Sequence, residues 1–136
     1  MKRFIIATYI IALLGIAMAS AAKPDTCGLQ FEEMTYDFGT IKEEAKTVVH
    51  EYQFVNTSDE AVAIIAAATS CGCTRPTFDA KPIAPGKSGK IKVTFYTRGQ
   101  AGEVSKDIKV KVRKASAKSA KRFTLKLTGV VIPQDK

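Results

Sequence analysis

The sequence has no tryptophan, a single histidine and only three cysteines. An antibody-like domain packs a tryptophan on a disulfide between widely separated cysteines, so this chain is not of that type. It also has no nucleotide-binding loop, no nucleophile elbow of a hydrolase and no helical zinc motif of a metalloprotease. We therefore expect no catalytic residues, no cofactor and no enzymatic activity.

The first 21 residues have the three parts of a secretory signal peptide. Lys2 and Arg3 precede an apolar run over residues 4–19, and small residues follow up to Ala21. The apolar run is shorter than the roughly 20 residues that span a bilayer comfortably. We expect cleavage after Ala21, export to the periplasm or the extracellular space, and no transmembrane segment in the mature chain.

The mature chain, residues 22–136, has the length of one domain. Removing the two basic residues of the signal peptide lowers the formal net charge from +8 to +6. This charge favours anionic partners such as glycans or lipid head groups. Because the protein is expected to be exported, we expect no nucleic-acid partner.

Apolar residues recur with a period of two, in runs separated by turn-forming residues, and no stretch is typical of a helix. We expect a turn near Gly39, a break at Pro76, an exposed loop over 114–121, and burial of the segment 61–69 on both faces. The pattern predicts strands at 29–34, 36–38, 47–55, 61–69, 90–97, 104–113 and 122–132.

Three of these strands alternate with particular regularity, so their core-facing residues can be named. The spacing and number of strands indicate an all-β protein, an immunoglobulin-like β-sandwich of about seven to eight antiparallel strands. The residues expected to face the core are Ile91, Val93, Phe95, Ile108, Val110, Val112, Phe123, Leu125 and Leu127.

Several short motifs together resemble an exported bacterial family, domain of unknown function 1573. They are Asp37-Phe38-Gly39, Asn56-Thr57-Ser58, Ser70-Cys71-Gly72-Cys73-Thr74, Pro85-Gly86-Lys87-Ser88-Gly89 and Leu127-Thr128-Gly129-Val130-Val131. The resemblance implies an immunoglobulin-like sandwich akin to domains of hydin and major sperm protein, which mostly act in binding or scaffolding. It transfers no catalytic role. Asp37-Phe38-Gly39 and the turn at Asn56 are carried over as residues that define the fold.

Cys71 and Cys73 carry the only distinctive chemistry in the sequence. In an extended strand their α-carbons lie about 6.6 Å apart, so a disulfide between them needs a turn at Gly72, which tolerates positive φ. Three roles remain open. The cysteines can be structural, either packed or in a disulfide that can include Cys27; they can exchange thiols; or, as an extended pair, they can bind a soft ion such as Cu(I). We prefer the structural role.

The remaining polar residues indicate no site. His50 is in phase with apolar residues of its strand, so we expect it to be packed, and Asn56 fits a turn better than a glycosylation acceptor. Glu32, Glu33, Glu43 and Glu44 are expected to be solvated. The basic residues that face outward are Lys90, Lys92, Lys109, Lys111, Arg113 and Lys126. We expect them to lie on different sheets and to form a solvated surface rather than an anion site.

These observations favour a non-enzymatic, exported binding or scaffolding module of the bacterial envelope. Its partner would be a protein or another envelope component, bound through loops or by adding a strand to an exposed sheet edge. The alternative is a small thiol-redox or Cu(I)-binding protein that uses Cys71 and Cys73.

Overall fold

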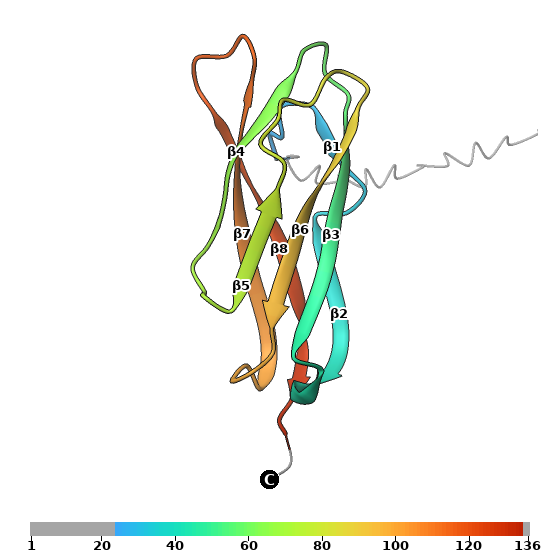
Figure 1. Cartoon of the computed structure of the whole chain (residues 1–136), viewed down its shortest axis with the longest axis vertical. Helices are drawn as coiled ribbons and strands as arrows, with labels where there is room; N and C mark the ends of the chain where they lie inside the picture. Colours follow the sequence, from blue (N-terminus) through green and yellow to red (C-terminus); the bar gives the residue numbers. More distant parts are fainter. Residues whose placement is uncertain (1–23, 135–136) are drawn as a thin grey trace, which may run out of the picture.

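The computed structural model describes residues 24–134, which form two four-stranded sheets packed face to face (Figure 1). The predicted all-β sandwich is confirmed, with eight strands. The predicted signal peptide lies outside the described residues. Within residues 24–134, no helix has the length and apolar character needed to cross a membrane.

The first sheet has the strand order β1-β3-β6-β5 and the second the order β2-β8-β7-β4. The strands of the first sheet are β1 (Leu29–Phe31), β3 (Thr47–Asn56), β6 (Ser88–Tyr96) and β5 (Thr74–Phe78). Those of the second are β2 (Thr35–Lys42), β8 (Lys121–Ile132), β7 (Gly102–Lys114) and β4 (Val62–Thr69). A short 3₁₀ helix, η1 (Glu43–Ala45), joins β2 to β3.

One strand pair differs from the predicted antiparallel arrangement, because β2 and β8 are parallel. No hairpin separates β1 from β2. The chain therefore crosses from the first sheet to the second without reversing, and β2 meets β8 running in the same direction. All other neighbouring strands are antiparallel.

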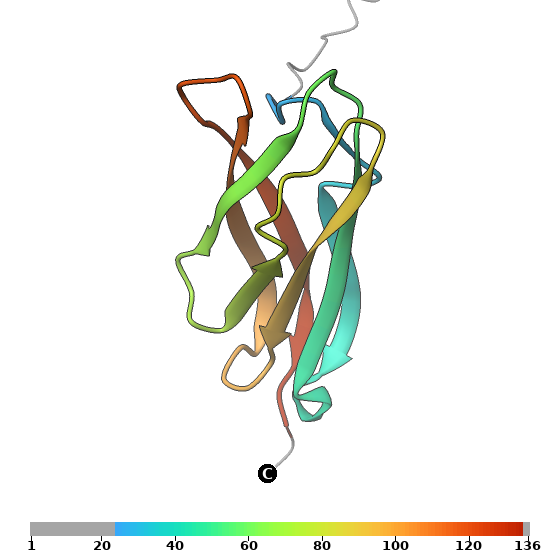
Figure 2. The ribbon, with the colours of Figure 1, turned by 45° about the horizontal axis from the view of Figure 1, so that its top comes forward.

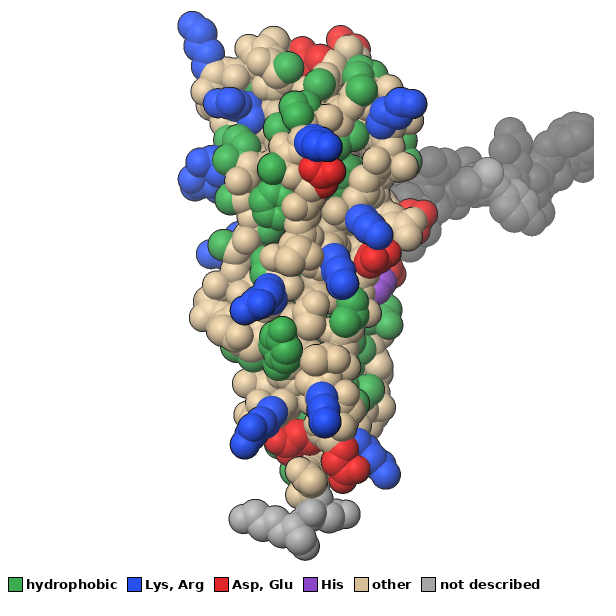
Figure 3. Space-filling view, viewed as in Figure 1, with side chains coloured by type: hydrophobic (Ala, Val, Ile, Leu, Met, Phe, Trp, Pro, Cys, Tyr) green, Lys and Arg blue, Asp and Glu red, His purple; other side chains and the backbone are tan. Residues whose placement is uncertain are grey.

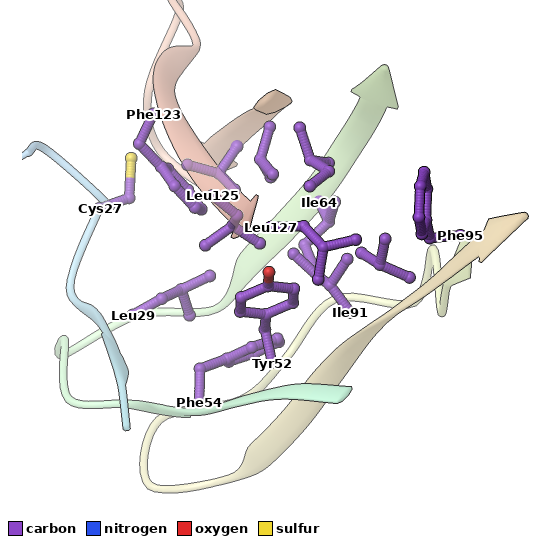
Figure 4. Packing of buried hydrophobic residues seen from close by; sticks show 14 of the residues in the cluster. Cys27, Leu29, Tyr52, Phe54, Ile64, Ile91, Phe95, Phe123, Leu125 and Leu127 are labelled. Carbon is purple, nitrogen blue, oxygen red and sulfur yellow. The ribbon is translucent and has the colours of Figure 1, made fainter. Parts of the chain in front are cut away.

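The core lies between the two sheets and contains all nine residues predicted to face inward, each at most 4% exposed. Burying such a side chain stabilises the fold by about 1.5–3 kcal/mol relative to leaving it in water. Tyr52 of β3 lies among them, and its hydroxyl donates a hydrogen bond of 2.5 Å to the carbonyl of Lys126 in the opposite sheet (Figure 4). Burial raises the pKa of Tyr52, so this hydroxyl stays protonated. The two sheets are thus joined by a polar contact as well as by apolar packing.

The turn predicted near Gly39 is instead a bulge inside β2. The register shifts between Asp37 and Thr40, Gly39 has a φ of +73°, and its N–H donates a hydrogen bond of 2.7 Å to Oδ1 of Asp37. The bulge directs Phe38 onto the backbone of Gly129, where any side chain would collide with its ring. The strand therefore continues through Gly39, because a bulge absorbs the left-handed residue without ending the pairing.

Two predictions, one for β4 and one for β5, are wrong. Each sheet of a two-layer sandwich has one face in the core and the other outside it, so β4 cannot be buried on both faces. Ile65 is 43% exposed, so β4 is buried on one face only. Pro76 lies within β5 and does not break it. A strand at the edge of a sheet needs N–H groups on one side only and can therefore contain proline.

Asn56 ends β3 and organises the turn that follows. It is fully buried, and its side-chain amide donates to the carbonyls of Glu60 (2.9 Å) and Ile83 (2.8 Å). Its Oδ1 accepts a hydrogen bond of 2.9 Å from the N–H of Ser58. The predicted turn is confirmed, and a buried amide with these partners is no acceptor for a glycan in the folded protein.

Candidate functional site

Cys71 and Cys73 form a disulfide, with their α-carbons 5.2 Å apart. The N–H of Thr74 donates a hydrogen bond of 3.3 Å to the carbonyl of Cys71, which closes the turn that this disulfide needs. Gly72 is not among the glycines with positive φ, so the predicted reason for a glycine there is wrong. A Cβ at position 72 would meet no atom within 4 Å. The turn therefore forms with an ordinary backbone conformation.

Cys27 is a free thiol and does not pair with either of these cysteines. It is 6% exposed and lies near Phe123 in the core (Figure 4), and burial raises the pKa of its thiol. Gly28, the residue after Cys27, lies against Ser58 in the connection that leads into the start of β4. Cys71, in contrast, comes just after the end of β4. Eight residues of strand span about 26 Å, which is too far for a disulfide.

Hydrogen bonds around the disulfide fix the segment in which the chain passes from the second sheet to the first. The carbonyl of Cys73 accepts a hydrogen bond of 2.7 Å from the N–H of Tyr96 on β6. The hydroxyl of Thr69 lies 2.8 Å from the carbonyl of Cys71 and 3.2 Å from that of Thr74. Residues 69–74, here called the disulfide corner, thus connect the end of β4 to the start of β5. Sequence reasoning found the cysteines but missed Thr69, which has no signal beyond its place before the motif.

A shallow pocket of about 140 Å³ lies beside this corner. Its lining includes Cys71 from the corner and Lys106 and Asp107 from β7. The disulfide can therefore be reached from solvent, next to one positive and one negative side chain. Within residues 24–134, no three or more His, Cys, Asp or Glu side chains are placed to share a metal ion.

His50 lies apart from the disulfide corner, on β3. Its ring stacks on Tyr36 of β2 with centroids 3.6 Å apart, so the predicted packed position is confirmed. Its Nε2 is 2.6 Å from Oε1 of Glu33, although the carboxylate lies out of line for a good hydrogen bond. Glu33 is exposed, as predicted, and its carboxylate also lies against the His50 ring.

Glu43 is also more than a solvated side chain. Its carboxylate accepts hydrogen bonds from the N–H groups of Gly99 (2.9 Å) and Gln134 (3.1 Å). These hydrogen bonds, which stabilise the charged form, lower the pKa of Glu43. They tie η1 to two distant parts of the chain, a pairing that no local pattern in the sequence could indicate.

The free edge of β4 is the second part of the candidate site. β4 pairs with β7 on one side, and on the other only Val62 is bonded, to Ile83, among residues 24–134. The rest of this edge has exposed Ala66 and Ala68 and contains neither charge nor proline. β4 and β5 lie on the same side of the sandwich, joined by the disulfide corner (Figure 2). We call this side the β4–β5 edge.

The predicted division of the basic residues between the two sheets is confirmed. Lys90 and Lys92 lie on β6 of the first sheet, and the others lie on β7 and β8 of the second. Arg122 also faces outward on β8 and was missed, although the alternation of that strand places it in phase with Lys126.

Solved structures with this arrangement come from diverse organisms. PapD-like domain 7 of human CEP192 is 13% identical, with a TM-score of 0.66 over 85% of this chain and 93% of that domain. A protein of unknown function from Porphyromonas gingivalis W83 is 15% identical, with a TM-score of 0.60 over 75% of this chain and 46% of its own. WR4, an MSP family member of C. elegans, is 11% identical, with a TM-score of 0.54 over 76% of this chain and 97% of its own.

At these identities the likeness concerns the fold alone. Among proteins with curated descriptions, none matches this sequence significantly. The family model described as protein of unknown function (DUF1573) matches residues 29–131. This range includes all eight strands except Ile132, the last residue of β8. The chain therefore belongs to the DUF1573 family.

Proposed function

We propose that this chain is an exported, non-enzymatic binding module that holds an extended segment of a partner protein along the free edge of β4. The observation that carries the proposal is the absence of charge and proline from that edge. Proteins usually protect edge strands with charges, prolines, bulges or short length. β1 has only three residues, β2 contains Asp37 and a bulge, and β5 contains Arg75 and Pro76.

The side chains of β4 suit such an addition. Alanines at positions 66 and 68 leave the backbone accessible, so a partner strand can approach its N–H and C=O groups. The bulge between Ile64 and Ala66 is the one protective feature of β4, and residues 66–69 beyond it pair regularly with β7. In this mode of recognition, main-chain hydrogen bonds supply affinity, and contacts with alternate side chains supply specificity. Exposed Ile65 is available for one of those contacts.

Export is part of the proposal and is supported by residues 1–21 of the sequence. A disulfide persists in oxidising compartments such as the periplasm or the cell exterior, which agrees with the Cys71–Cys73 pair. In this proposal the disulfide corner has a structural role, because it fixes the end of β4 at which the added segment would begin or finish.

Photocrosslinking in the native host tests the proposal. A photoreactive amino acid replaces Ala68 on β4, and the control replaces Thr40 on the β2 edge, which is also exposed. We expect position 68 to crosslink to an extended segment of a protein that also binds the purified mature domain, and position 40 not to do so. Equal crosslinking from both positions, or a partner whose crosslinked segment is helical, contradicts the proposal.

Thiol exchange at Cys71–Cys73 is a second candidate, favoured by the pocket that exposes this disulfide beside Lys106. A thiolate of a partner dithiol would attack one sulfur, form a mixed disulfide and release the other cysteine as a thiolate. The partner's second thiolate would then break the mixed disulfide, leaving the partner oxidised and both cysteines reduced. A nearby positive charge stabilises the released thiolate.

Intact mass of protein purified from its own compartment distinguishes these roles. With alkylation before reduction, a structural disulfide leaves Cys71 and Cys73 unmodified, whereas an exchanging pair leaves a population with both alkylated. A second spectrum, taken under native conditions without alkylation, reports any copper bound by the reduced pair. Full oxidation together with resistance to a dithiol reductase contradicts the exchange role.

A further inference from the structure

The outer face of the second sheet carries a cluster of positive charges with an acidic residue at its border, Asp107 of β7, which lies two residues before Lys109 and directly opposite Lys126 of β8. Lys111 of β7 lies directly opposite Arg122 of β8, so two like charges are neighbours. Within residues 24–134, neither side chain forms an ion pair. On its other side β7 borders β4, where the opposite residues are alanines at 63, 66 and 68. We call the four outward residues of this region the basic face: Lys109, Lys111, Arg113 and Arg122.

The outer face of the first sheet is arranged differently. Lys90 of β6 forms an ion pair of 3.0 Å with Glu51 of β3, and Lys92 lies directly opposite the same glutamate. Figure 3, which shows this side of the molecule, has several basic side chains next to acidic ones. Charges on the first sheet are therefore mixed in sign, whereas the four residues of the basic face have the same sign and Asp107 lies only at their border.

Protection against edge pairing does not explain the basic face. Lysine serves that purpose on edge strands, but β7 and β8 are the two central strands of their sheet. Like charges directly opposite each other on a sheet also reduce stability. The fold thus tolerates an arrangement that it does not need, which points to a role outside folding.

The β7–β8 hairpin extends this surface beyond the body of the sandwich (Figure 1). Its connection contains exposed Lys118 between alanines and serines. Lys121, at the base of the hairpin, forms an ion pair of 3.5 Å with Asp25 and is in phase with buried Phe123, so it does not add to the basic face. The connection is held by Ser116, whose hydroxyl lies 2.8 Å from Oε1 of Glu60. Lys118 therefore projects from an anchored connection.

We propose that the basic face docks the mature domain on an anionic lipid membrane, through the phosphates of its head groups. The charges form a grid, with about 6.8 Å between alternate residues along β7 and about 4.8 Å between strands. A grid of separate charges on a flat sheet complements a surface of many separate head groups, whereas a compact anion needs donors that converge. This surface is the outer face of the sheet and is independent of strand addition at the edge.

Vesicle flotation tests the proposal with two charge-matched triple variants of the mature chain. The vesicles contain phosphatidylcholine alone or mixed with phosphatidylglycerol. The variant of the basic face is Lys109→Gln, Lys111→Gln and Arg113→Gln, and the control on the first sheet is Arg75→Gln, Lys90→Gln and Lys92→Gln.

The wild type is expected to bind only the vesicles with phosphatidylglycerol and to release them at high salt. The basic-face variant should bind about a hundredfold more weakly, and the control should stay close to the wild type. Thermal unfolding should show both variants folded, with the basic-face variant at least as stable as the wild type. Equal losses in both variants, or retention on soluble polyphosphate without binding to anionic vesicles, would overturn the proposal.

Discussion

The two lateral edges of the sandwich are built from different kinds of contact. One edge is formed by β2 and by the part of β3 that β1 does not cover, and we call it the β2–β3 edge. There Tyr36 stacks on His50, Phe38 packs on Gly129, and Glu43 closes the end through η1. The β4–β5 edge has alanines and a local disulfide instead. The difference shows that large side chains link the two sheets at one edge, whereas at the other small side chains leave the backbone of β4 open to approach.

The largest effect is expected at Phe38, on the packed edge. Phe38→Ala removes a ring that stacks near Phe95, with centroids 5.7 Å apart, and leaves a cavity above Gly129. We expect a loss of about 3 kcal/mol in the free energy of unfolding, measured with urea. Val49→Ala, on an exposed position of β3, is the control and should change stability by less than about 0.5 kcal/mol. Similar losses in both variants would show that this edge is not specially packed.

The disulfide at the other edge should matter less for stability. The loop between Cys71 and Cys73 is very short, so cross-linking removes little entropy from the unfolded chain. Replacing both cysteines with serine should lower the free energy of unfolding by about 1.5 kcal/mol. A reductant should lower the free energy of unfolding of the wild type by a similar amount and leave that of the double variant unchanged. Unfolding of the double variant at room temperature would mean that the corner supports the whole sandwich.

Acid should loosen the end of the β2–β3 edge through Glu43. The pKa of Glu43 is lowered in the folded state. Its contribution to the free energy of unfolding is therefore fully present above the unfolded-state pKa near 4.5, and it is lost as the pH falls through the folded-state pKa. The stability difference between the wild type and Glu43→Gln should therefore shrink below pH 4.5. Glu44→Gln, which removes a neighbouring exposed carboxylate, is the control. A difference that is constant with pH contradicts this role of Glu43.

The smallest effect on stability is expected on the β4–β5 edge. Ile65→Lys places a charge at an exposed bulge, so the free energy of unfolding should change by less than about 0.5 kcal/mol. The same charge should prevent strand addition and abolish binding of the partner identified from position 68. Thr40→Lys on β2 should leave binding intact. Normal binding by Ile65→Lys would place the partner elsewhere on the domain.

Much of the fold could be predicted because alternation is a local signal. The spacing of Ile91, Val110 and Leu125 indicates which face of each strand is buried, and the structure confirms it. The number of layers and the strand order are not local, so the exposure of Ile65 and the place of Pro76 within an edge strand were missed. For the site, the sequence singled out the cysteines, but their pairing with each other depends on how a turn closes in three dimensions.

Amide hydrogen exchange of the mature domain, with and without the crosslinked partner, tests the central claim most directly. Amides of β4 that do not bond to β7 should exchange quickly in the free domain and become protected in the complex. Amides on the outer side of β2 should exchange at the same rate in both states. Protection confined to β2 or to the loops, with β4 unchanged, would contradict the proposal that the free edge of β4 binds the partner.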